Sequence, residues 1–255
     1  MTTLRRAFLA LALVSTIAAL AAERLPDHVR NRLTSAWRPA PVAVIDGEAT
    51  ASRRAKVLRR PRTRGTASAV VRTTPHTYFG RVVAQRDSVL DRWPTRVDQP
   101  VRVWIANGER SEGWRPSFLV QLVEAFDDWE ETGIPVHFTF VNDSADAEVR
   151  VRWADTLTGR ASGRTTWRAD VNRLMLGADV WIAMRASDGA LQDDRGVRAI
   201  ALHEIGHLLG LAHSGGREDI MAAWVAADTL SDADRATVRL LYALPAGRVR
   251  ASSGD

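Results

Sequence analysis

The sequence predicts an α+β domain over residues 91–247, in which helices pack against a mixed β-sheet. The first observation is the order of the apolar segments, which follow one another as strand, helix, strands, helix and helix. The second is the composition, because 45% hydrophobic residues in a chain of 255 allow a sizeable core. No internal repeat is found, so the pattern describes one domain.

The first half of this domain contains one helix and three strands. The segments with strand periodicity are 100–107, 136–141 and 147–154. In the first of them, Val101 and Val103 alternate with polar or partly polar residues, as a half-buried strand requires. Apolar residues recur at helical spacing in 116–133, with Pro116 near the start and Gly133 just beyond the end.

The second half adds a pair of short strands and two helices. The segments 173–177 and 178–184 predict a short hairpin or a pair of edge strands. A long helix is predicted over 193–211, and a last helix over 231–244 with Ser231 as its N-cap.

Residues 1–22 have the layout of a secretory signal peptide. Arg5 and Arg6 precede a short apolar run, and Ala19-Leu20-Ala21 fits a cleavage site with small residues. The run is short for a membrane span, and no other segment of the sequence is apolar enough to be one. The prediction is a secreted or periplasmic protein without stable membrane insertion, and the alternative is an uncleaved membrane anchor.

Residues 23–90 form a basic region, with 14 Arg or Lys against 5 Asp or Glu. Its segment 53–68, RRAKVLRRPRTRGTAS, has little periodicity and is typical of a flexible, protease-sensitive stretch. A propeptide, a linker and a disordered arm are all compatible with this pattern. The opposite charge of the following domain favours docking of the region on it, and the alternative is an arm without contacts. Residues 248–255 are expected to be a flexible tail.

The overall composition limits the chemistry available to the protein. The chain has no cysteine, which excludes disulfides, thiolate metal sites and a cysteine nucleophile. The isoelectric point near 10.7 arises mainly from arginine. However, no basic helix face and no alternation of basic and aromatic residues is present, so a nucleic-acid partner is not predicted.

The segment AIALHEIGHLLGLAH, residues 199–213, carries the most informative pattern. His203 and His207 are four residues apart, so on a helix both imidazoles leave the same face. Gly210 can end the helix in a left-handed conformation, after which His213 can approach from another direction. Three imidazoles and one open position match a catalytic zinc site.

Glu204 follows the first of these histidines and is close enough to hold a metal-bound water without being a ligand. Zinc lowers the pKa of such a water, and Glu204 would accept its proton and return it to the leaving amine. The predicted reaction is therefore hydrolysis of an amide bond. The full pattern H-E-x-x-H-x-x-G-x-x-H arises by chance in only about one in 10⁴ sequences of this length.

This pattern is the metzincin signature, and HEIGHLLGLAHS followed by DIM resembles the matrixins, the matrix-metalloprotease branch with bacterial members. The resemblance covers about residues 90–244. It implies a twisted, mostly parallel five-stranded sheet with three helices and a cleft beside the sheet edge. It also places Met221 as the Met-turn residue under the zinc site. The Tyr-Pro that usually follows the Met-turn is missing here; Trp224 or Val225 is the candidate lining of the specificity pocket, and the alternative for both is plain packing.

The sequence also departs from the family pattern. His137 is the only histidine between residue 91 and the motif, so the second, structural zinc of vertebrate relatives is not expected. Calcium remains a candidate cofactor, and its possible oxygen ligands, which fit no loop template, are Asp188, Asp193 and Asp194. If the basic region keeps the enzyme inactive, it cannot do so through a cysteine bound to zinc, because the chain has none. Asp46 or His76 could bind the zinc instead, or the basic region could cover the cleft.

The leading interpretation is a secreted zinc endopeptidase that acts on proteins or peptides. The alternatives are a non-catalytic zinc-binding adhesion or interaction protein and a zinc amidase acting on a non-protein amide. Retention of Glu204 argues against the first alternative. The sequence does not determine the cleavage specificity or the oligomeric state.

Overall fold

The computed structural model describes residues 25–34, 69–71 and 76–251. The predicted signal peptide and Asp46 lie outside these residues. Within the described ranges, no helix combines the length and the apolar character needed to cross a membrane.

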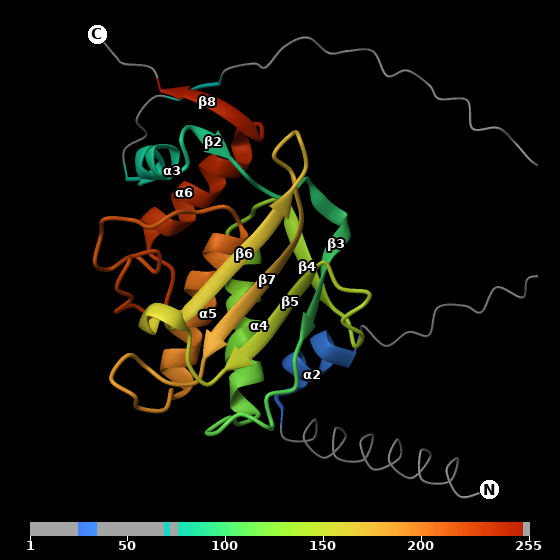
Figure 1. Cartoon of the computed structure of the whole chain (residues 1–255). Coiled ribbons are helices and arrows are strands. Elements are labelled where there is room, and N and C mark those ends of the chain that lie inside the picture. Colours follow the sequence, from blue (N-terminus) through green and yellow to red (C-terminus); the bar gives the residue numbers. More distant parts are fainter. Residues whose placement is uncertain (1–24, 35–68, 72–75, 252–255) are drawn as a thin grey trace, which may run out of the picture.

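A five-stranded, mostly parallel sheet forms the centre of the domain (Figure 1). Its strands, in the spatial order β4-β3-β5-β7-β6, are β4 Val136–Phe140, β3 Arg96–Ile105, β5 Val149–Ala154, β7 Met175–Ala183 and β6 Gly163–Ala169. All neighbours pair in parallel except β6, which runs antiparallel to β7. The α+β class and the sheet implied by the resemblance are confirmed.

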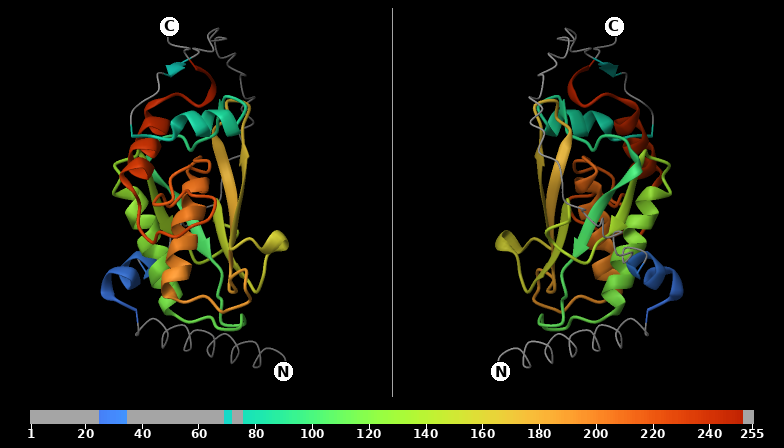
Figure 2. Two further views of the ribbon diagram at one scale, coloured as in Figure 1. Left: turned by 90° about the vertical axis from the view of Figure 1, so that its left-hand side faces the viewer. Right: turned by 90° about the vertical axis from the view of Figure 1, so that its right-hand side faces the viewer.

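Two helices cover one face of this sheet (Figure 2). They are α4 Ser117–Glu130 and α5 Asp194–Leu208, and a third helix, α6 Asp232–Ala243, follows in the chain; all three are close to the predicted helices. The indole Nε1 of Trp129 on α4 donates to the carbonyl oxygen of Leu202 on α5 at 2.9 Å. This bond satisfies a polar group inside the core and fixes the two helices against each other.

The predicted hairpin at 173–184 was wrong. Residues 175–183 form the single strand β7, and its hairpin partner is β6, which the sequence analysis did not identify. β6, with the sequence GRTTWRA, lies at the sheet edge and alternates between half-buried and exposed residues. It therefore lacks the apolar periodicity by which the other strands were found.

Part of the basic N-terminal region belongs to the same core. Helix α3, Phe79–Gln85, buries Phe79, Val82 and Val83. A second, three-stranded sheet has the order β1-β8-β2, with strands β1 Ala69–Val71, β8 Gly247–Ala251 and β2 Val89–Leu90. The chain therefore continues in a paired strand to residue 251, beyond the predicted start of the tail at 248. A short 3₁₀ turn, η1, spans Thr158–Arg160.

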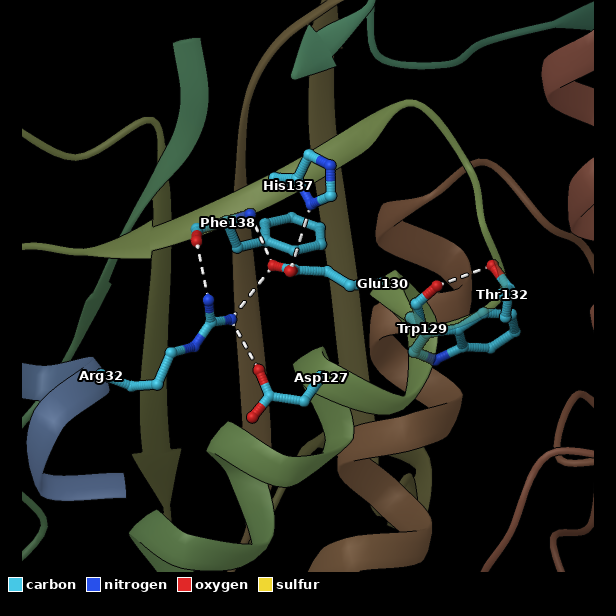
Figure 3. Close-up of polar contacts among 7 residues, drawn as sticks. All are labelled: Arg32, Asp127, Trp129, Glu130, Thr132, His137 and Phe138. Carbon is cyan, nitrogen blue, oxygen red and sulfur yellow. Dashed lines mark hydrogen bonds and ion pairs between the residues drawn. The ribbon is translucent and has the colours of Figure 1, made fainter. Parts of the chain in front are cut away.

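Helix α2, Asp27–Thr34, docks beside α4 and β4 (Figure 3). Val29 is completely buried there. The Arg32 guanidinium lies 2.6 Å from the Asp127 carboxylate and 3.0 Å from that of Glu130. Residues 25–34 of the basic region are therefore docked on the domain and held by its acidic residues, and they are not an arm without contacts.

The same contacts occupy backbone groups of the edge strand β4. Glu130 Oε1 accepts a hydrogen bond from the Phe138 amide at 2.7 Å, and Arg32 donates to the Phe138 carbonyl at 3.5 Å (Figure 3). His137 lies beside this group, with Nδ1 3.3 Å from Glu130 Oε2. Both outward backbone groups of Phe138 are therefore occupied by side chains.

Candidate active site

The three histidines of the motif meet at one point, as the sequence predicts. One ring nitrogen from each of His203, His207 and His213 lies within 4.8 Å of those of the other two. The Nε2 atoms of His207 and His213 are 3.3 Å apart. Two nitrogens bound to one tetrahedral zinc at about 2.0–2.1 Å would be separated by roughly the same distance.

The local fold brings the three histidines to this point from two directions. His203 and His207 project from one face of α5, whose N-terminus is capped by Asp193 accepting from the Gly196 amide at 2.7 Å. The helix ends before Gly210, which has a φ of +100°. A side chain at Gly210 would also overlap the Asp91 carbonyl, so glycine is required there for two reasons.

Backbone carbonyls orient the imidazole rings. His203 Nδ1 donates to the Ile220 carbonyl at 2.7 Å, and His207 Nδ1 donates to the Leu211 carbonyl at 3.0 Å. Each bond fixes the tautomer that leaves Nε2 free to bind a metal ion. Burial lowers the pKa of His203 to about 4 and that of His207 to about 3, so both rings are neutral at physiological pH.

Glu204 lies deep in the site with only 4% of its surface exposed. Its Oε2 accepts a hydrogen bond from Thr165 Oγ1 on β6 at 2.6 Å. Burial raises the pKa of Glu204 to about 7, although the Thr165 bond acts in the opposite direction. Gly163, also on β6, leaves room for the carboxylate, since a Cβ at that position would overlap Glu204 Oε1.

Thr165 and Gly163 are therefore site residues that sequence reasoning missed. They lie on the strand that was not predicted, and neither residue type signals catalysis by itself. The available signal was the position of GRTTWRA before a strongly apolar strand, from which a hairpin could have been inferred.

Met221 is completely buried below α5. A Cβ at Gly206 would overlap its Sδ atom, which shows how closely the methionine packs against the helix turn between the two histidines. The neighbouring Ile220 carbonyl is the one that orients His203. The segment at Met221 thus supports the floor of the site by packing and by one backbone bond.

The buried carboxylate of Asp234, at the N-terminus of α6, holds this segment in place. Asp234 is completely inaccessible to solvent. Its oxygens accept hydrogen bonds from the Ile220 amide at 2.8 Å, the Ser231 amide at 2.9 Å and the Tyr78 hydroxyl at 2.9 Å. A chain of two contacts therefore joins Asp234 to the orientation of His203.

A cleft of about 610 Å³ opens in front of the histidines. Gly163, Arg164 and Thr165 of β6 line one side of it. Trp224 and Val225 line the cleft as well. The side chain of Trp224 is 87% exposed, whereas Val225 is half-buried and packs against the core.

The sequence profile of the matrixin family, peptidase M10, matches residues 114–243, which is half of the chain and includes the whole site. The chain belongs to the matrixin family. No curated protein matches it at a significant level. Membership of this family indicates zinc metallopeptidase activity on protein or peptide substrates, and the histidine trio fits the catalytic zinc that matrixins bind.

The residues predicted to bind calcium or to block the zinc site of this matrixin are not part of the histidine trio. Asp188 and Asp193 each accept a local backbone amide, and Asp194 accepts a hydrogen bond from the hydroxyl of Ser117 at 2.8 Å. Calcium binding by these three residues stays a prediction. His76 is exposed and does not join the histidine group found among the described residues.

Proposed function

We propose that this matrixin is a secreted zinc-dependent endopeptidase, in which His203, His207 and His213 hold one zinc ion and Glu204 is the catalytic base. The observation that carries the proposal is the juxtaposition of the buried Glu204 carboxylate with three imidazoles whose remaining nitrogens converge. Secretion rests on the layout of residues 1–22.

The zinc ion, when bound, supplies Lewis-acid polarisation of the scissile carbonyl and lowers the pKa of water. The residues of the chain supply the rest. Glu204 is buried beside the three imidazoles, so its carboxylate can take up a proton from the attacking water and then give it to the amine that leaves. Thr165 holds the carboxylate in one orientation through its 2.6 Å bond.

The sheet edge offers a place for the substrate backbone. Among the described strands, β6 pairs only with β7, so its outer backbone groups can bind an extended peptide by adding it to the sheet. Such a peptide would cross the site directly, because Gly163 and Thr165 of β6 flank Glu204. Trp224 and Val225 would contact side chains of the substrate on the opposite wall.

A peptide library tests this function. We would incubate the zinc-loaded full chain with mixed fluorogenic peptides, beside the Glu204→Ala variant with its zinc content measured. The full chain is used because residues 25–34 and 76–90 contribute to the core. Cleavage by the parent that is lost in the variant, while zinc is retained, would support the endopeptidase.

Absence of cleavage by both, with zinc bound in both, would contradict it and favour the amidase or the binding protein.

The role of Trp224 in the specificity pocket is tested by the variant Trp224→Ala. Because Trp224 is exposed, this change should leave the melting temperature within about 1 °C and change the ranking of cleaved peptides. An unchanged ranking would remove Trp224 from the pocket.

A further inference from the structure

A second cavity lies on the other side of the histidine site. Its volume is about 300 Å³, and it shares Thr165, His207 and His213 with the main cleft. Trp167, two residues further along β6, forms another part of its lining. A peptide that follows β6 across the site would therefore enter the main cleft on one side of the scissile bond and this cavity on the other.

Arg86 is the only residue with a permanent charge in the lining of this second cavity. It follows helix α3 and lies outside residues 114–243, the part that matches the matrixin profile. Its guanidinium carbon is 4.4 Å from the centre of the Trp167 ring, and its NH2 group donates to the Leu211 carbonyl at 2.8 Å. Both contacts hold the guanidinium at the cavity wall.

The carboxylate that acts electrostatically on Arg86, that of Asp91, is already engaged elsewhere. Asp91 is buried and binds Arg173 through two contacts, 2.7 Å to Nε and 2.9 Å to an NH2 group. Asp91 also accepts from the Trp167 indole at 3.2 Å. Two arginines thus face one carboxylate, and the group keeps a net positive charge beside the cavity.

We propose that this second cavity is a substrate subsite in which Arg86 binds an acidic side chain, so that the enzyme prefers peptides with Glu or Asp a few residues to one side of the scissile bond. A guanidinium with a fixed plane is well suited to bind a carboxylate with two parallel hydrogen bonds. This inference rests on the proposed endopeptidase function and names its substrate class.

A structural role of Arg86 is the competing explanation. Together with Gln85, whose amide donates to the His213 carbonyl at 3.0 Å, it braces the loop that carries the third histidine. A brace would affect all substrates equally. An acid-binding subsite would affect only the ratio between acidic and neutral substrates.

The experiment uses matched peptides that carry Glu or Gln at each of three positions on both sides of the scissile bond. For the zinc-loaded full chain we expect a kcat/KM ratio of Glu to Gln of about tenfold at one position on one side, the low end for a charge-assisted hydrogen bond. Arg86→Gln should bring this ratio close to one, and Arg86→Lys should retain part of it. Gln85→Ala should keep the ratio even if all rates fall.

Binding provides a readout that does not depend on turnover. The zinc-loaded Glu204→Ala variant should bind the Glu peptide more tightly than the Gln peptide, and the added Arg86→Gln change should remove the difference. A ratio near one in the parent, or the same ratio in Arg86→Gln, would overturn the subsite. If no peptide is cleaved but the binding difference is present, the endopeptidase fails and the subsite stands.

Discussion

Replacing Asp234 by Asn removes a charge and an acceptor from the most buried carboxylate of the structure. Oδ1 accepts from the Tyr78 hydroxyl, and Oδ2 accepts from the Ile220 and Ser231 amides. The side-chain amide of Asn keeps one oxygen and turns the other acceptor into a donor. With the amide nitrogen in the place of Oδ2, the Ile220 and Ser231 amides lose their acceptor. In the place of Oδ1 it can donate to the Tyr78 oxygen, but the Tyr78 hydroxyl then loses its own acceptor.

Each buried donor left without an acceptor costs about 1–3 kcal/mol. Removal of the buried charge returns part of its desolvation cost, so we expect a loss of about 3 kcal/mol in the free energy of unfolding. With a urea slope of about 3 kcal/mol/M, the unfolding midpoint should fall by about 1 M. The Ile220 carbonyl also orients His203, and zinc should therefore be released faster to a chelator.

The matched control is Asp232→Asn in the same helix turn, because Asp232 is exposed. We expect it to change stability by less than about 0.5 kcal/mol. Urea unfolding of the zinc-loaded full chain, followed by tryptophan fluorescence, measures both variants. Equal midpoints for Asp234→Asn and Asp232→Asn would refute the idea that the carboxylate holds the floor of the site.

Three further changes test other contacts. Thr165→Val should lower kcat/KM about tenfold, because the buried Glu204 carboxylate loses its hydrogen bond, whereas Thr165→Ser should keep most of the parent rate. Equal rates for the Val and Ser variants would argue against positioning of Glu204 by the hydroxyl. Gly206→Ala places a methyl group against the buried methionine sulfur below α5, so it should destabilise the chain by about 1–3 kcal/mol in thermal unfolding and cause loss of zinc. A melting temperature equal to that of the parent would show that the methionine can move aside. Arg32→Met removes the ion pairs to α4, so it should weaken the docking of α2 by about 1 kcal/mol and increase hydrogen exchange in residues 25–34 alone. Unchanged exchange there would mean that the apolar contacts of α2 are enough to hold it.

The parts of the fold that the sequence predicts are those with strong periodicity or caps. Helix α6 illustrates this, since Ser231 forms a capping box with Asp234 and marks the first turn. The histidine trio was predictable because helical spacing and one glycine determine where three imidazoles can meet. These signals are local, and local contacts are what a single sequence records.

The parts that could not be predicted depend on distant contacts. β6 is recognised only by its pairing with β7, because its own residues show no apolar face. The Glu204 partner Thr165 is 39 positions away in sequence. The basic composition of the N-terminal region similarly masked the fact that α3 buries three apolar residues against the domain.

The occupied edge at β4 has a consequence for self-association. An open β-sheet has two edges, and each is a template on which another chain can pair. At β4 the side chains of Glu130 and Arg32 already take the backbone groups of Phe138. Two molecules of this protein are thereby hindered from joining their sheets at β4, while at β6 no further strand pairs with the outer edge within the described part of the chain. Loss of α2 would free the Phe138 carbonyl, whereas Glu130 on α4 would still occupy the Phe138 amide and keep part of this protection.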